Sequence, residues 1–94
     1  MCDIRELILR RRRQLLVHSV IYYRFNENLI SDQTWSTWAV ELEKLQKEYP
    51  KEADEVELAE AFKNFNHSTG YNLPLEDPWA VGQARWLLSI AGII

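Results

Sequence analysis

The chain has 94 residues, a net charge of −3 and 47% apolar residues, including four tryptophans. This length allows one domain with a modest core, and the apolar content excludes a disordered chain. The acidic balance disfavours a dedicated nucleic-acid binder, which would have a basic surplus. Cys2 is the only cysteine of the sequence, which excludes a disulfide within the chain and indicates a reducing, cytoplasmic setting.

The charges are unevenly distributed along the sequence. Residues 1–25 contain six arginines against two acidic residues, whereas residues 26–94 contain twelve acidic residues against five basic ones. This split is typical either of a basic binding face or of helices that neutralise each other. Both interpretations are open at this point.

A first helix is predicted for residues 3–25, where apolar side chains such as Leu7, Leu15 and Val20 recur at helical spacing. Four successive arginines interrupt its middle. Successive helix residues are about 100° apart, so these arginines circle the axis. At least one should lie beside the apolar stripe with its charged head extended to solvent. We interpret them as a solvated collar; the alternative is a contact patch for nucleic acid or an acidic partner, formed by Arg10, Arg11, Arg12 and Arg13.

A second helix is predicted after a turn at residues 26–28. Ser31 or Asp32 can cap its first N–H groups, and the carboxylate of Asp32 suits the positive end of the helix dipole. Pro50 ends this helix. Its apolar side chains form one seam at helical spacing: Trp35, Trp38, Leu42, Leu45 and Tyr49.

A third helix is predicted from about Glu52, because acidic side chains favour the first turn of a helix. A loop over residues 66–77 follows, with Gly70 and Pro74 as its turn residues. The apolar stripe of the third helix consists of Leu58, Phe62 and Phe65.

A fourth helix is predicted from Pro78 to Ile94, with Asp77 as its N-cap and proline at its first position. It is apolar on nearly all sides, so we expect it to be the central helix of the bundle or to dock on a partner, and a homodimer is left open. This run has 17 residues, fewer than the about 20 of a membrane helix, so no membrane span is expected. The sequence thus predicts an all-α fold, a compact bundle of about four helices in a single domain over residues 1–94.

The sequence lacks the motifs of common enzymes and metal sites. It contains no G-x-G-x-x-G, no phosphate-binding Walker loop and no H-E-x-x-H. His18 and His67 are distant from each other and from Cys2, so the close ligand spacing of a zinc site is missing. We expect His18 to be a half-buried helix residue and His67 to be accessible in its loop. No metal and no autonomous enzyme activity are expected.

Residues 11–50 resemble the small N-terminal helical domain, domain Ia, of bacterial NAD-dependent DNA ligases. In that family a helix ends in Tyr–His or Tyr–Tyr, an Ile–Ser–Asp-like step leads to Asp-x-x-Tyr-Asp, and a Glu–Leu–x–x–Leu–Glu-type run ends in His–Pro or similar. The corresponding pieces here are Tyr22–Tyr23, Ile30–Ser31–Asp32, Trp35–Ser36, the run "ELEKL" at residues 41–45, and Tyr49–Pro50.

The resemblance covers roughly 40 of 94 residues and implies an N-terminal helical hairpin like that of domain Ia. Residues 51–94 are unfamiliar from the ligases. The whole chain is similar to small stand-alone ligase-related proteins of Gram-positive phages and prophages.

In the ligases, domain Ia closes over the nicotinamide mononucleotide (NMN) half of NAD. The resemblance therefore implies a nicotinamide-facing corner in which aromatic rings stack on the cationic pyridinium and a carboxylate attracts its charge. NAD or NMN is the ligand implied, although no cofactor is required. The residues implied are Tyr22, Tyr23, Asp32, Trp35 and Ser36.

This sequence departs from the family at three points. Ser36 replaces the second aspartate, Trp35 replaces a tyrosine, and the sequence contains no Lys-x-Asp-Gly. Without that nucleophilic lysine the protein cannot ligate DNA by itself. The alternative for the corner is that Tyr22, Trp35 and Trp38 are core aromatics of a helical hairpin.

We therefore expect a non-catalytic binding module of the bacterial cytoplasm. It acts through contacts with a protein, a host ligase or another host factor, and retains some recognition of nicotinamide nucleotide. The alternatives are a small anti-defence inhibitor of a host protein and a DNA-associated accessory protein that uses the four arginines on phosphates, although DNA contact is not favoured.

Overall fold

The computed structural model describes residues 3–63, 65–67 and 73–93. Cys2 and Gly70, singled out in the sequence, lie outside these residues. The described chain forms four helices, α1 (Ile4–Arg24), α2 (Asp32–Glu48), α3 (Pro50–Glu55) and α4 (Pro78–Ile90), and contains no strand. The prediction of a compact all-α bundle is confirmed.

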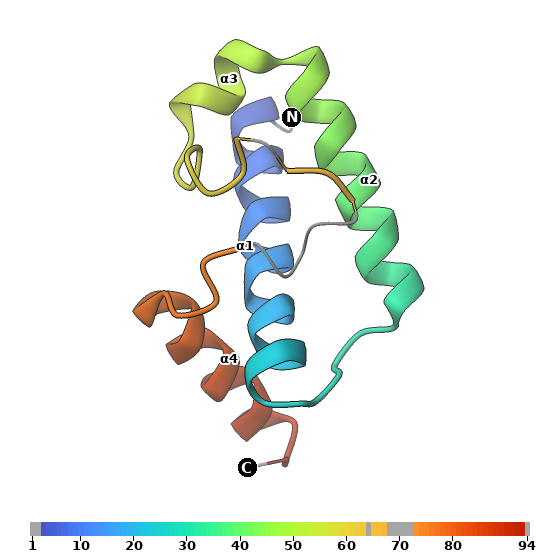
Figure 1. Ribbon diagram of the computed structural model, residues 1–94, viewed down its shortest axis with the longest axis vertical. Coiled ribbons are helices and arrows are strands. Elements are labelled where there is room, and N and C mark those ends of the chain that lie inside the picture. The colour runs from blue at the N-terminus through green and yellow to red at the C-terminus, as the bar shows by residue number, and fades with distance from the viewer. Residues whose placement is uncertain (1–2, 64, 68–72, 94) are drawn as a thin grey trace.

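Helix α1 is the central element of the bundle. It packs against each of the other three helices, with α2 and α4 on opposite sides of it (Figure 1). Its Leu15, Leu16, Val20 and Ile21 are fully buried. The expectation that residues 78–94 form the central helix is wrong: α4 packs on α1 through a narrow strip and leaves Trp86 58% exposed.

The predicted starts of α1, α2 and α4 are confirmed by their caps, whereas α3 begins at Pro50 instead of near Glu52 and has no side-chain cap. The side chain of Asp3 accepts a hydrogen bond from the backbone N–H of Arg5 and begins α1. Ser31 accepts from Thr34 and begins α2. Asp77 accepts from Ala80 and begins α4. Each cap satisfies an N–H group that the helix itself cannot pair.

Helix α3 is much shorter than predicted. It ends at Glu55, whereas the apolar stripe in the sequence predicted that it continues to Phe65. The guanidinium of Arg12 donates to the carbonyl oxygen of Ala53 at 2.8 Å and to those of Val56 and Glu57 at 3.1 Å each. A longer helix would use these oxygens for the N–H groups four residues later. The chain leaves the helix at Val56, which is extended with φ of −98° and ψ of 148°, and Arg12 pairs with these oxygens instead.

The expectation that the four arginines form a solvated collar is wrong for Arg12. Its side chain is 2% exposed, with the charged head directed inward rather than to solvent. Its Nε and Nη2 donate to Oε1 of Gln46 at 3.0 and 2.9 Å, and Nε2 of Gln46 donates to the carbonyl of Phe62 at 3.1 Å. Burial lowers the pKa of Arg12 from its ordinary value. This network joins α1, α2 and the segment after α3.

Helix α4 ends at Ile90 instead of continuing to the end of the chain. Gly92 adopts a left-handed conformation with φ of 78°, which costs glycine little. Its N–H donates to the carbonyl of Ser89, and the N–H of Ile93 donates to that of Leu88. Among the described residues, no helix is long and apolar enough to cross a membrane.

Candidate functional site

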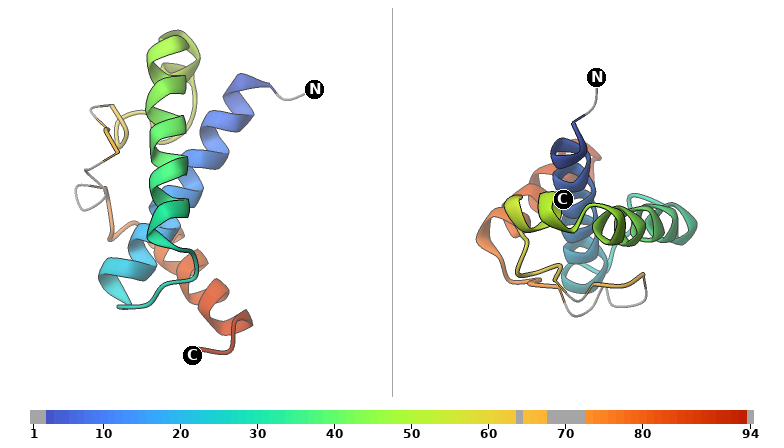
Figure 2. Two further views of the ribbon diagram at one scale, coloured as in Figure 1. Left: turned by 90° about the vertical axis from the view of Figure 1, so that its right-hand side faces the viewer. Right: turned by 90° about the horizontal axis from the view of Figure 1, so that it is seen from above.

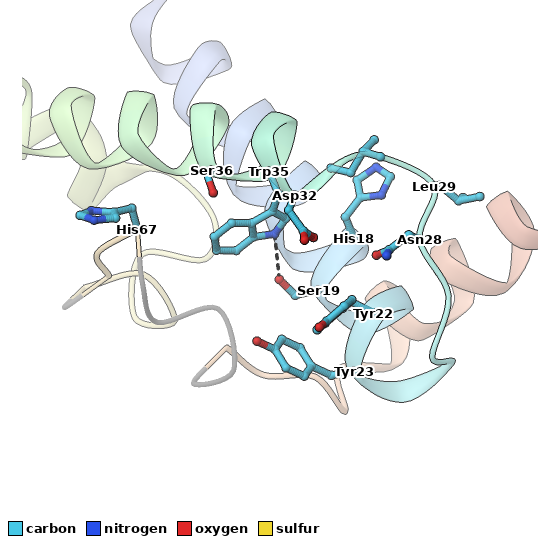
Figure 3. A pocket seen from close by; sticks show the side chains of 11 residues that line it. His18, Ser19, Tyr22, Tyr23, Asn28, Leu29, Asp32, Trp35, Ser36 and His67 are labelled. Atoms are coloured by element: carbon cyan, nitrogen blue, oxygen red, sulfur yellow. Dashed lines mark hydrogen bonds between the residues drawn. The ribbon is translucent and has the colours of Figure 1, made fainter.

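A pocket of about 280 Å³ lies between the C-terminal part of α1, residues 28–30 and the first turns of α2 (Figure 3). The chain folds back here because α1 ends at Arg24 and Asn26 takes a left-handed conformation with φ of 55°. The N–H of Glu27 then donates to the carbonyl of Ile21 at 3.2 Å. This turn places the end of α1 beside the start of α2.

All five residues assigned to the nicotinamide corner line this one pocket. Two come from α1 and three from the first turns of α2, and they are Tyr22, Tyr23, Asp32, Trp35 and Ser36. Asp32 and Trp35 are three residues apart and therefore share one face of the helix, which Figure 3 shows directed toward α1. The structure thus brings together residues that the sequence separates by up to 14 positions.

Trp35 is held in place from two directions. Its indole N–H donates to Oγ of Ser19 at 3.2 Å, and its ring meets Phe65 edge-on at a centroid distance of 6.4 Å. Ser19 is 1% exposed. Trp35 is partly buried against the core, so one wall of the pocket is fixed before any ligand binds.

The two tyrosines form a more exposed wall. Their rings pack edge to face at a centroid distance of 4.8 Å, and each side chain is 48% exposed. The alternative of core aromatics therefore describes Trp35 and Trp38, which pack against the core, but not Tyr22. An exposed aromatic pair at a pocket mouth leaves ring surface available to a ligand.

Two histidines that were not assigned to the corner also line the pocket. His18 packs on Trp38 at a centroid distance of 5.9 Å. Its Nδ1 is buried without a hydrogen-bond partner among the described residues. Burial lowers the pKa of His18 below its ordinary 6.5, so its ring is uncharged at neutral pH.

His67 approaches the pocket from the loop after Phe65. Its side chain is 57% exposed, and its Nδ1 lies 3.6 Å from a carboxylate oxygen of Glu43. The accessibility expected for His67 is confirmed, but the sequence did not indicate Glu43 as its neighbour. The sequence could have indicated His18 as a pocket residue, because it precedes Tyr22 by one helical turn and therefore lies on the same face of α1. No local pattern could have indicated that His67 lies beside Glu43, because the two are 24 residues apart in the sequence.

The four successive arginines circle α1 rather than forming one basic patch. Arg11 pairs with Glu41 at 3.0 Å and lies over the Trp38 ring, Arg12 is buried, and Arg13 contacts Glu57 at 3.4 Å. Of the four, Arg10 and Arg12 make no ion pair with the described part of the chain. The uneven charge of the sequence thus reflects helices that neutralise each other. No group of metal-binding side chains occurs among the described residues.

Comparison with known proteins provides no relative for this chain. No protein-family model, no curated protein and no solved structure matches it. The resemblance to ligase domain Ia remains a prediction, and a functional proposal depends on the contacts of the pocket.

Proposed function

We propose that this protein is a non-catalytic binding module that holds the nicotinamide ring of NMN, or of the corresponding half of NAD, between α1 and α2. The supporting observation is that Tyr22, Tyr23, Asp32, Trp35 and Ser36 line a single pocket. The resemblance to ligase domain Ia had assigned these five residues to that ring.

The chemistry of the pocket suits a flat cation. Aromatic faces attract cations by about 0.5–2 kcal/mol, and the carboxylate of Asp32 adds attraction at the same site. The volume of about 280 Å³ is at the lower limit of the roughly 300–1,000 Å³ of small-molecule sites. A pyridinium ring with its ribose fits that size better than a whole dinucleotide.

Binding rather than catalysis is proposed because the sequence contains no Lys-x-Asp-Gly. Nucleotidyl transfer in the ligases needs that lysine as the nucleophile. A chain that holds the nicotinamide half of the nucleotide without it can sequester the nucleotide or present it to another protein.

Titration with NMN, followed by tryptophan fluorescence, tests this proposal because Trp35 lines the pocket. We expect saturable quenching by the unmodified protein. Asp32→Ala should weaken binding about fivefold, since an exposed charge pair contributes about 1 kcal/mol. Asp54→Ala removes an exposed carboxylate elsewhere and should leave the affinity unchanged. Absence of saturable quenching at millimolar NMN contradicts the proposal.

A second candidate function is protein binding through the outer face of α4. This face exposes Trp86 and Ile90 by 58% and 63%, with Trp79 and Ile93 also exposed. Adjacent exposed apolar side chains of this size are typical of interaction surfaces, and a host DNA ligase is the partner that the resemblance implies.

Calorimetric titration with a purified host NAD-dependent ligase tests this second function. Trp86→Glu places a charge on the face and should abolish binding, whereas Gln33→Glu, at an exposed position of α2, should not. Equal affinity of both variants for the ligase contradicts docking through α4. Light scattering of the protein alone determines whether the same face forms a homodimer.

A further inference from the structure

The charges around the pocket favour nicotinamide ligands that have only the positive charge of the ring over those that also have a negative charge. Asp32 is the only side chain with a permanent charge among the described residues that line it, and no lysine or arginine contributes. The sequence positions outside the described ranges contain no lysine or arginine either. A ligand with its own negative charge would therefore meet one carboxylate and no cationic side chain.

The start of α2 is less favourable to an added anion than helix N-termini often are. The hydroxyl of Ser31 already accepts from the N–H of Thr34 at 3.0 Å. Asp32 places a carboxylate in the same first turn. The positive end of this helix dipole is thus occupied by the negative charge of the chain itself.

The histidines do not supply the missing positive charge. His18 has a pKa lowered by burial and is uncharged at neutral pH. His67 lies 3.6 Å from the carboxylate of Glu43, so a charge on its ring would be balanced within the chain. Arg24 follows Tyr23 and is exposed, but it does not line the pocket.

We infer that the pocket selects its ligand by the positive charge of the ring and has no site for a phosphate. This inference rests on the proposed function and narrows it to pyridinium nucleosides. Nicotinamide riboside should bind at least as tightly as NMN, because a phosphate gains no counter-ion. A pyridinium that bears a carboxylate in place of the amide should bind about tenfold more weakly, because its negative charge is repelled by Asp32.

Parallel titrations with nicotinamide riboside, NMN and nicotinic acid mononucleotide test the inference at one pH and ionic strength. We expect the riboside and NMN to differ by less than threefold and the nicotinic acid form to be about tenfold weaker than NMN. Asp32→Asn keeps the shape of the side chain and should reduce the tenfold preference to about twofold. Arg24→Ala should leave the affinity for NMN unchanged.

The outcomes separate this inference from the proposed function. NMN binding at least tenfold tighter than the riboside, or a loss of NMN affinity in Arg24→Ala, shows that a phosphate is recognised and overturns the inference alone. Equal affinity for the amide and acid forms also overturns it. Failure of all three ligands to bind overturns the proposed function together with the inference. Far-UV circular dichroism confirms that each variant is folded.

Discussion

Arg12 is a buried cation whose partners are mainly backbone carbonyls rather than a carboxylate. Its guanidinium binds the carbonyl oxygens of Ala53, Val56 and Glu57 and the side chain of Gln46. These oxygens face the positive group at the C-terminal end of α3, where a cation is favoured by the helix dipole. The residue thus pairs with the carbonyl oxygens at the end of α3 and attaches residues 53–57 to α1.

Replacing Arg12 should strongly destabilise the protein. Arg12→Met keeps much of the side-chain volume but leaves three carbonyl oxygens and Gln46 without their donor, and unsatisfied buried groups cost about 1–3 kcal/mol each. We expect a loss of about 3–5 kcal/mol in the free energy of unfolding, as measured by urea denaturation. The control Arg10→Met changes an exposed residue and should alter stability by less than about 0.5 kcal/mol. Similar losses in both variants would contradict the role of Arg12.

His18 should make stability depend on pH. Its pKa is lowered in the folded protein from the ordinary 6.5, so the unfolded chain takes up a proton at higher pH than the folded one. The contribution of the neutral ring is complete above about 6.5 and is lost as the pH falls through the lowered pKa of the folded state. Urea midpoints at pH 7.5 and 5.5 should fall less in His18→Phe than in the unmodified protein. An identical fall in the two proteins would contradict this explanation.

At the scale of elements, α4 has one glycine inside it and a second just beyond its end, in different environments. Gly82 is inside the helix, and a Cβ added there would meet nothing within 4 Å. Gly92 follows the helix with φ of 78°, a conformation that other residues adopt with strain. The first glycine lowers helix stability without a packing reason, whereas the second terminates the helix.

The same substitution should therefore have opposite effects at these two sites. Gly82→Ala should stabilise the protein by about 0.5–1 kcal/mol, the difference in helix propensity between the residues. Gly92→Ala should destabilise it by about 1 kcal/mol. Thermal unfolding of both variants measures the signs, and destabilisation by Gly82→Ala would show that a close contact forms at that glycine.

At the scale of the whole molecule, local signals predicted the starts of α1, α2 and α4 and the residues that share a helix face, because caps and i, i+3 spacing act within a few residues. Ser31, Asp77 and the shared face of Asp32 and Trp35 illustrate this. The failures involve distant pairs. The carbonyl of Ala53 at the end of α3 pairs with Arg12, 41 residues earlier, and the central place of α1 depends on how all four helices pack.

For the candidate site, too, the sequence indicated some residues but not the contacts between distant parts of the chain. Its tyrosines, Asp32, Trp35 and Ser36 followed from a family pattern, whereas Ser19 and the pair of His67 with Glu43 required the fold. Spacing along the sequence cannot show which side chain of α1 holds an indole of α2, because the crossing of the two helices determines it.

The central position of α1 also governs how the molecule opens. Helix α4 contacts only α1 among the described helices (Figure 2), so it can detach by breaking a single interface while the α1–α2 hairpin remains closed. Unfolding of α1 breaks the interfaces with α2, α3 and α4 at once and leaves only the contact between α2 and α3, so it amounts to global unfolding. Amide hydrogens of α4 should exchange with solvent through such partial opening, and those in the middle of α1 only when the whole chain unfolds.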